Sequence, residues 1–417
     1  MKYNFDHVID RSNTNSIKYD FAEEFGKPSD ILPLWVADMD FQAPAEVIQA
    51  LKAAAEHGIY GYSSHKEDYL RALHSWFSLR FKWNFEDKWL VKTPGVVYAI
   101  ATAIRAFTNE GDGVIIQQPV YYPFAGLVKN NKRRLVINSL VRSSEVIGSL
   151  KVEDKIKSVE NTVVCENDYQ IDFDDFEKQI IAEHVRLFIL CSPHNPVGRV
   201  WTRTELGRLG EICLRHNVVI ITDEIHMDFV YPGRSHTIFN SLSTELAEQT
   251  VLCTAPSKTF NLAGLQVANI FIANENLRLE FRAEMNRSGY SEIGIMGLVA
   301  CQAAYKYGAD WLDELLIYLQ GNLSWLEKYM ETEMPQVSLV RPEGTYLVWL
   351  DFRRVLPEDL ERKRFITGDA RLWLDEGTMF GAEGSGYERV NIACPRATLE
   401  LAMQQLRTAL NSRENLL

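Results

Sequence analysis

The sequence predicts an α/β fold, with a large domain built on a mainly parallel sheet between helices and a smaller α/β domain formed by both chain ends. Several short runs are apolar throughout, as strands buried on both faces of a sheet are. Helical patterns alternate with these runs, which is typical of a parallel sheet covered by helices. A chain of 417 residues also exceeds what one hydrophobic core usually holds, so two domains are expected.

The elements follow this plan from one end of the chain to the other. An N-terminal segment (1–45) is expected to pack with the small domain, and the large domain is expected over 46–290. The apolar runs predict strands at 113–117, 135–138, 186–191, 218–222, 250–254 and 267–273. Helical periodicity predicts helices at 45–55, 69–81, 96–107, 202–216 and between 278 and 307. The small domain (291–417) is expected to contain a helix at 311–330, a strand at 345–351, a glycine-rich loop at 377–386, a strand at 389–393 and a helix from Ala397.

Composition narrows the class of protein. The chain has a formal net charge of −12, and an acidic surface disfavours nucleic acid and anionic membranes as main partners. The six cysteines are scattered without CxxC spacing, which favours reduced thiols over a disulfide framework or a zinc site. The first residues contain no apolar signal region, and no run of 18 apolar residues occurs. A cytoplasmic location is therefore expected.

The strongest chemical signal is the stretch Thr254-Ala255-Pro256-Ser257-Lys258-Thr259-Phe260-Asn261-Leu262-Ala263-Gly264. Lys258 follows a predicted strand and has small and apolar neighbours. Burial there would lower the pKa of its amine and make it a nucleophile toward an aldehyde. The alternative is a loop lysine that extends to solvent, and Lys258 considered alone favours that alternative.

A carboxylate ends another apolar run, Val218-Val219-Ile220-Ile221-Thr222-Asp223. A buried carboxylate is costly unless it pairs with a cation, and a protonated pyridine nitrogen would be such a cation. The alternative is an aspartate that caps a helix. Glu224 and His226 follow closely and suggest a metal site, but no second histidine occurs at the usual spacing, so a metal is not expected.

A third motif, Cys191-Ser192-Pro193-His194-Asn195-Pro196-Val197-Gly198, also follows a predicted strand. Asn-Pro is ordinary turn chemistry. The amide of Asn195 can also donate a hydrogen bond to a phenolate oxygen.

Together these motifs resemble the fold-type I pyridoxal-5′-phosphate (PLP) enzymes of the aspartate aminotransferase superfamily, and the resemblance covers essentially the whole chain. It implies that Lys258 holds PLP covalently, that Asp223 pairs with the pyridine nitrogen and that Asn195 bonds the 3′-oxygen of the ring. His226 stands where many members have a tyrosine that bonds the same oxygen. Tyr121 matches the aromatic residue that stacks on the ring, with a core tyrosine as the alternative reading and the adjacent Tyr122 as its rival.

The resemblance also implies a phosphate site. The segment before the helix at 96–107 supplies backbone donors at a helix N-terminus, namely Gly95, Val96 and Val97. Members of the superfamily often have an arginine where this chain has Gln266 and a serine where it has Ala255, so Ser257 is expected to compensate. Tyr62 resembles the tyrosine that binds the phosphate of the neighbouring subunit, which implies a homodimer with shared active sites.

The α-carboxylate of the substrate is expected to bind an arginine in Tyr387–Arg396. Planar guanidinium groups bind carboxylates through two parallel hydrogen bonds. Arg389 matches the family position best, and Arg396 is the rival.

Three segments resemble the cystathionine β-lyase (C–S lyase) branch: Leu34–Phe41, Asp223–His226 and Ala393–Arg396. The resemblance implies cleavage of the Cβ–S bond of cystathionine, cysteine or cysteine S-conjugates, which yields a thiol, pyruvate and ammonia. Arg389 and the backbone of Val36 and Ala37 would orient the small sulfur-containing amino acid, and Lys258 would take the Cα proton. The alternatives are a true aminotransferase and a PLP-fold protein that binds a regulatory partner.

Overall fold

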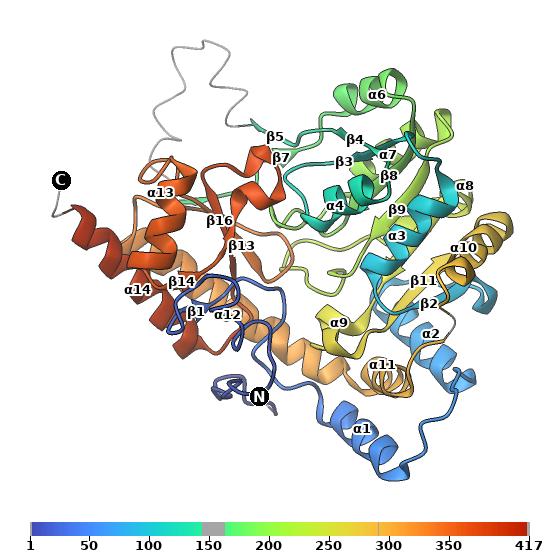
Figure 1. The fold of residues 1–417 in the computed structure, drawn as a ribbon, viewed down its shortest axis with the longest axis horizontal. Coiled ribbons are helices and arrows are strands. Elements are labelled where there is room, and N and C mark those ends of the chain that lie inside the picture. The colour runs from blue at the N-terminus through green and yellow to red at the C-terminus, as the bar shows by residue number, and fades with distance from the viewer. Residues whose placement is uncertain (1, 144–162, 291, 415–417) are drawn as a thin grey trace.

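A computed structural model describes residues 2–143, 163–290 and 292–414 (Figure 1). Its largest sheet has seven strands in the order β2 (Leu90–Thr93), β11 (Ala268–Ile272), β10 (Thr250–Thr254), β9 (Val219–Asp223), β8 (Val185–Cys191), β3 (Gly113–Ile116) and β4 (Arg134–Ile137). The neighbours from β10 to β4 are parallel, whereas β11 runs antiparallel to both β10 and β2. The expected mainly parallel sheet is therefore confirmed, with one antiparallel strand inside it.

Both faces of this sheet are covered by hydrophobic cores. Alternate residues of β8 point to opposite sides, so Leu187 joins one core and Phe188 the other. The core with Leu187 includes α3 (Val96–Phe107), α4 (Pro123–Asn130) and α10 (Glu275–Arg287). The core with Phe188 includes α6 (Phe173–Ala182) and α7 (Arg203–Arg215). A sheet enclosed in this way leaves only its edges and strand ends free to form a site.

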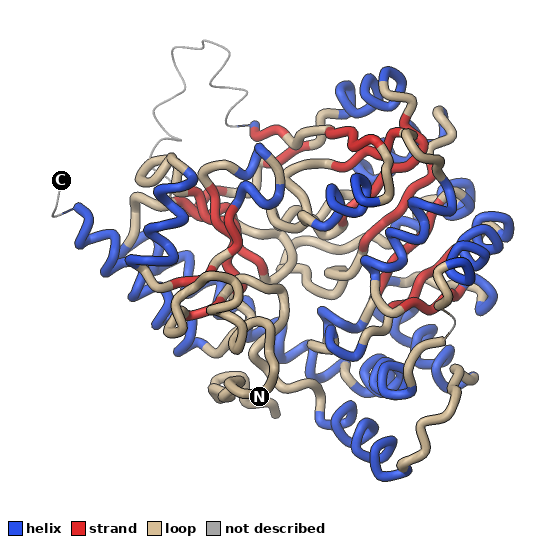
Figure 2. The backbone as a smooth tube through the Cα atoms, in the orientation of Figure 1, coloured by secondary structure: helices blue, strands red, loops and turns tan. Residues whose placement is uncertain are grey.

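A second sheet has five strands, four from the C-terminal part of the chain and one, β6 (Val164–Cys165), from its middle. Its order is β15 (Asp375–Glu376), β16 (Tyr387–Asn391), β13 (Leu347–Asp351), β12 (Ser338–Val340) and β6. The helices of this part are α12 (Ala309–Glu333), α13 (Asp359–Arg364) and α14 (Arg396–Glu414). The N-terminal strand β1 (Leu32–Pro33) pairs with β14 (Leu372–Trp373), so the N-terminal segment joins this part of the structure. Figure 2 shows loops running between the two groups of strands.

The expected elements agree with the structure to within a few residues at most ends. The helix expected at 69–81 begins two residues earlier, as α2 (Glu67–Phe81), and the first helix is α1 (Ala45–His57). The strand expected from 345 begins at Leu347 because Thr345 has a φ of 69°, which breaks extended pairing. The glycine-rich loop contains two short 3₁₀ turns (Gly377–Phe380 and Ala382–Gly384).

The elements that were not predicted include β2, β6, β12, α4 and α6. Helix α11 (Ile295–Tyr307) packs against α1 and α2 although the sequence places it after the expected domain boundary. The division at 45 and 290 stays a prediction. Within the described ranges no helix combines the length and apolarity that a membrane span requires.

Candidate active site

A cavity of about 490 Å³ opens at the carboxyl ends of the parallel strands, where ligands bind in open α/β sheets. Loops after β8, β9 and β10 line it, together with the first turn of α3, the N-terminal segment and β16. The predicted site residues on its wall are Val36, Ala37, Gly95, Val96, Val97, Tyr121, Asn195, Asp223, His226, Ser257, Lys258 and Arg389. Of the predicted set, only Tyr62 lies elsewhere.

Lys258 lies on α9 (Pro256–Thr259), a single helical turn that follows β10 and begins with proline. Its Nζ donates a hydrogen bond to the carbonyl of Ala37 (2.8 Å). Burial lowers the pKa of Lys258 to about 8, while Asp38 and Asp223 oppose this shift. A substantial fraction of the amine is therefore neutral near physiological pH and able to act as a nucleophile or a base.

Asp223 is the last residue of β9 and is 4% exposed. One carboxylate oxygen accepts a hydrogen bond from the backbone N–H of Ile225 (3.2 Å). Burial raises the pKa of Asp223 to about 7, because the attraction of Lys258 only partly offsets the loss of hydration. A strand-end carboxylate in this state gains most from a cationic group bound in the cavity.

His226 and Asn195 offer unused hydrogen-bonding groups to the same cavity. Burial holds the pKa of His226 well below its ordinary value, so the ring is neutral, and its Nδ1 has no partner among the described residues. The side-chain oxygen of Asn195 accepts a hydrogen bond from Arg389 Nη1 (2.9 Å). This contact orients the amide and leaves its NH₂ group to donate to a ligand.

Arg389 lies on β16 and is 2% exposed. Besides Asn195, its guanidinium donates to the carbonyl of Trp35 (2.9 Å) and forms an ion pair with Asp375. Asp375 is paired directly opposite Arg389 in the β15–β16 register. Arg389 Nε is buried without a partner among the described residues. This donor remains for a carboxylate ligand.

The rival arginine is engaged elsewhere. Arg396 begins α14, and its Nε donates to Asn322 Oδ1 (2.9 Å). Arg396 is absent from the cavity wall. The geometry therefore favours Arg389 as the carboxylate-binding residue.

The first turn of α3 lies on the cavity wall and has the free backbone N–H groups that can bind an anion. Gly95 caps the helix with a φ of 155°, a conformation that favours glycine, and the free N–H groups of the next residues follow it. Gln266, in the left-handed conformation with φ of 51°, lies beside this turn, because a Cβ on Gly95 would be 4.0 Å from Gln266 Oε1. Gln266 lines the cavity although it replaces the arginine that many family members have. Ser257, which was expected to compensate for this replacement, lines the cavity as well.

The aromatic residues leave one alternative open. Both Tyr121 and its neighbour Tyr122 line the cavity, with ring centroids 5.4 Å apart. Tyr62 is fully exposed, on the loop between α1 and α2. Its side chain does not contribute to the cavity of its own subunit.

Sequence reasoning missed several residues that matter to this geometry. Asp375 supports Arg389 from the opposite strand, and Tyr346 donates to the Ala37 carbonyl (3.0 Å). No signal for Asp375 was present in the sequence, because a carboxylate beside a glycine-rich loop is ordinarily exposed to solvent and its burial appears only in the structure. Its pairing with Arg389 depends on strand register, which the sequence did not reveal.

Comparisons with known proteins agree with this architecture. Residues 29–406 match the family model described as aminotransferase class I and II. The chain is 38% identical to cystathionine beta-lyase PatB of Bacillus subtilis over 98% of this chain and 100% of that protein. It also resembles a PLP-bound putative aminotransferase from Clostridium difficile (39% identity, TM-score 0.90, 98% of this chain and 100% of that chain). Cystalysin from Treponema denticola, which contains PLP, is similar as well (34% identity, TM-score 0.90, 99% and 100%). The chain thus belongs to the aminotransferase class I and II family.

Proposed function

We propose that this protein is a PLP-dependent carbon–sulfur β-lyase. It would convert cystathionine, cysteine or cysteine S-conjugates to a thiol, pyruvate and ammonia. The observation that carries the proposal is that a nucleophilic lysine, a buried strand-end aspartate and a buried arginine share one cavity, in a chain 38% identical to a cystathionine β-lyase over nearly its whole length.

The chemistry of the donors fits PLP. The N-terminal turn of α3 suits the phosphate, Asp223 suits a protonated ring nitrogen, and the unpartnered His226 Nδ1 suits a ring oxygen. The free NH₂ group of Asn195 suits the same oxygen. When bound, PLP supplies an electron sink for the electron pair that remains when a proton leaves Cα.

Arg389, Lys258 and Asp223 would then have separate roles in the reaction. Arg389 holds the α-carboxylate, with its guanidinium fixed by Asn195, Asp375 and the Trp35 carbonyl. The Lys258 amine, whose pKa is about 8, removes the Cα proton and can return it to the leaving group or to solvent. Asp223 keeps a proton on the ring nitrogen by its negative charge.

A homodimer in the cytoplasm is part of the proposal. Tyr62 is exposed on a loop that also exposes Ile59 and Tyr60, so this loop has apolar surface available for a second copy of the chain. The scattered cysteines, which show no CxxC spacing, support a reducing compartment.

The test is pyruvate release from L-cystathionine by the PLP-loaded protein with no 2-oxo acid added. A lyase forms pyruvate continuously, whereas an aminotransferase stops after one turnover because its amino group has no acceptor, and a binding protein forms none. The aminotransferase is the second candidate because one similar structure is a putative aminotransferase. Lys258→Ala should abolish pyruvate release, and Lys52→Ala, on the exposed face of α1, should leave it unchanged.

A further inference from the structure

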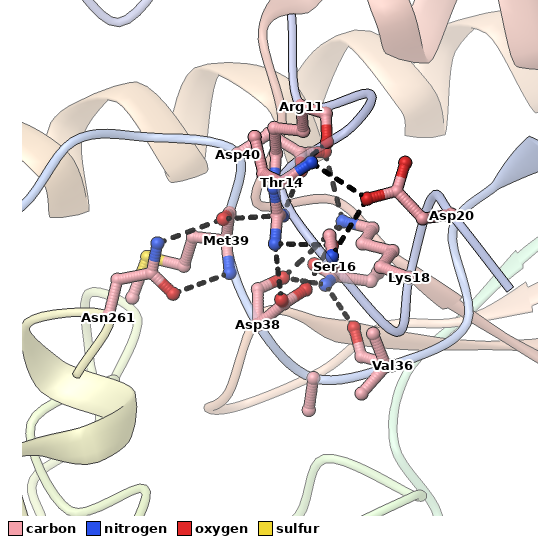
Figure 3. Close-up of polar contacts among 12 residues, drawn as sticks. Arg11, Thr14, Ser16, Lys18, Asp20, Val36, Asp38, Met39, Asp40 and Asn261 are labelled. Carbon is pink, nitrogen blue, oxygen red and sulfur yellow. Dashed lines mark hydrogen bonds and ion pairs between the residues drawn. The ribbon is translucent and has the colours of Figure 1, made fainter. Parts of the chain in front are cut away.

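An ionic cluster in the N-terminal segment adjoins the residues of this segment that line the cavity (Figure 3). We use this name for Arg11, Lys18, Asp38 and Asp40. The side chain of Lys18 is completely buried, with Nζ 2.9 Å from Asp40 Oδ2 and 3.6 Å from Asp38 Oδ1. Arg11 bridges the same two carboxylates at 2.8 Å from Asp38 and 2.7 Å from Asp40. The four charges sum to zero, and each carboxylate contacts both cations.

The turn between Arg11 and Lys18 is held by hydrogen bonds to the side chain of Asp20. Asp20 accepts hydrogen bonds from the backbone N–H groups of Asn13 (2.8 Å), Thr14 (2.9 Å) and Ser16 (3.0 Å). Asn13 has a φ of 58°, a left-handed conformation that asparagine tolerates. Arg11 and Lys18 are therefore presented from a defined turn and not from a loose chain end.

The other side of the cluster is the cavity wall. Val36 and Ala37 line the cavity, and the carbonyl of Ala37 accepts the hydrogen bond from Lys258 (2.8 Å). The next residues are bonded to the chain just after Lys258, since Asn261 accepts from Met39 N–H and donates to the Met39 carbonyl, both at 2.9 Å. The position of this backbone and the position of Lys258 are thus coupled.

We propose that Arg11 and Lys18 are positioning residues for substrate binding, because through Asp38 and Asp40 they fix the backbone of residues 36–39 as a wall of the cavity. Neither side chain lines the cavity, so neither is a catalytic residue. An apolar contact would bury the segment equally well, but it would not set its register. Charged groups that are buried and paired at short distances accept few other arrangements, because any slip leaves a charge without its partner.

The test measures binding separately from chemistry. It rests on the proposed function for the choice of substrate, so its first readout is the dissociation constant of L-alanine, an amino acid with no β-substituent to eliminate. This constant is obtained from the change in absorbance of the PLP-loaded protein. Lys18→Met and Arg11→Gln should each raise it by between about 10- and 100-fold, the range expected for a misplaced binding wall. KM for L-cystathionine should rise in parallel, with a smaller fall in kcat because the Ala37 carbonyl that bonds Lys258 shifts with the wall.

A matched control separates positioning from stability. Arg142 is also buried, pairs with Asp168 at 2.8 Å and is absent from the cavity wall. Arg142→Met should lower the melting temperature and leave L-alanine binding unchanged. If Arg142→Met weakens L-alanine binding as much as the cluster variants do, or if both cluster variants bind L-alanine like wild type, the proposal is wrong.

Arg11 is 21% exposed, so Arg11→Gln remains a test should Lys18→Met fail to fold. Failure of the lyase function would appear separately, as intact L-alanine binding without pyruvate release.

Discussion

At the scale of single residues, the binding role proposed for Arg389 has to share one guanidinium with an ion pair. Asp375 offsets its charge in the free protein, and Nε remains without a described partner. In the proposed function, a substrate carboxylate would therefore meet a guanidinium that is already oriented. The orientation depends on strand register, since Asp375 and Arg389 are direct partners across β15 and β16.

This arrangement predicts different consequences for the two arginines. A lysine cannot reproduce two parallel hydrogen bonds, so Arg389→Lys should raise KM strongly and lower kcat, because a loosely held substrate misaligns its Cα–H bond. Arg396→Lys should change both much less, since Arg396 contacts Asn322 outside the cavity. Steady-state kinetics with one cysteine-type substrate decide between them. A stronger defect in the Arg396 variant would assign the carboxylate to Arg396.

Asp223 predicts a pH dependence of stability in the cofactor-free protein. Its pKa is about 7 in the folded chain, against an ordinary aspartate value of 3.8 in the unfolded chain, so the unfolded chain loses this proton first as pH rises. The ionised carboxylate therefore lowers the free energy of unfolding between about pH 4 and pH 7. Asp223→Asn, which does not titrate, should become progressively more stable than wild type over that window and equally stable below it. Thermal melts of both proteins at several pH values check this.

Binding of PLP should reduce or reverse this difference in stability between wild type and Asp223→Asn. A cationic ring nitrogen stabilises ionised Asp223, so PLP should raise the melting temperature of wild type more than that of Asp223→Asn. Turnover of the variant should also slow by orders of magnitude, because the ring nitrogen loses its charge partner. A variant with wild-type turnover would mean that Asp223 serves only as a local structural cap.

At the scale of elements, the first turn of α3 predicts a backbone requirement. Gly95 has a φ of 155°, and an alanine there strains the turn that presents N–H groups to an anion. Gly95→Ala should therefore weaken PLP binding by about tenfold, equivalent to about 1.4 kcal/mol. Gly207→Ala is the control, since Gly207 lies inside α7 with open space around it and should slightly stabilise the helix. Equilibrium titration of the cofactor-free proteins with PLP would show the difference, and equal affinity in both would remove the phosphate role from this turn.

Elements with strong periodicity could be predicted, and elements defined by tertiary pairing could not. Helix α3 was expected at the residues where it occurs, because its apolar stripe is long and continuous. The antiparallel direction of β11 leaves no local mark, since a strand buried on both faces has the same composition in either direction. The ionic cluster was missed for a related reason. The N-terminal segment (1–45) contains all of its residues, but Lys18 lies about twenty residues before Asp38 and Asp40, in a stretch without periodicity that could reveal the pairing.

At the scale of the whole molecule, one cavity collects residues from the seven-stranded sheet, from β16 of the second sheet and from the N-terminal segment. Local motifs predicted the loops after β8, β9 and β10, because strand ends are easily recognised in the sequence. The position of the N-terminal segment follows instead from contacts such as β1 with β14, which join residues more than 300 positions apart. Contacts between residues so far apart in the chain could not be predicted from the sequence.

The last prediction concerns a second copy of the chain. Tyr62 is fully exposed and does not line the cavity of its own subunit, so any role at the phosphate must be in the cavity of a partner. A dimer of Lys258→Ala with Tyr62→Ala would then contain one site that lacks both groups and one site that has both. Such heterodimers, isolated with two different affinity tags, should recover about half the activity of the wild-type dimer, although each parent variant is severely impaired. This half-recovery follows from two independent sites per dimer.

Tyr60→Ala provides the matched control, because Tyr60 lies on the same exposed loop and bonds only the Ala55 carbonyl among the described residues. This variant should keep nearly full activity as a homodimer and should also be dimeric by light scattering. If purified Lys258→Ala/Tyr62→Ala heterodimers stay inactive while Tyr62→Ala alone is impaired, Tyr62 acts within its own subunit and the shared site is wrong. If Tyr62→Ala alone is fully active, the loop contributes contact surface and no phosphate ligand. The heterodimer thus distinguishes a loop that only contributes contacts between subunits from a loop whose Tyr62 acts in the cavity of the partner.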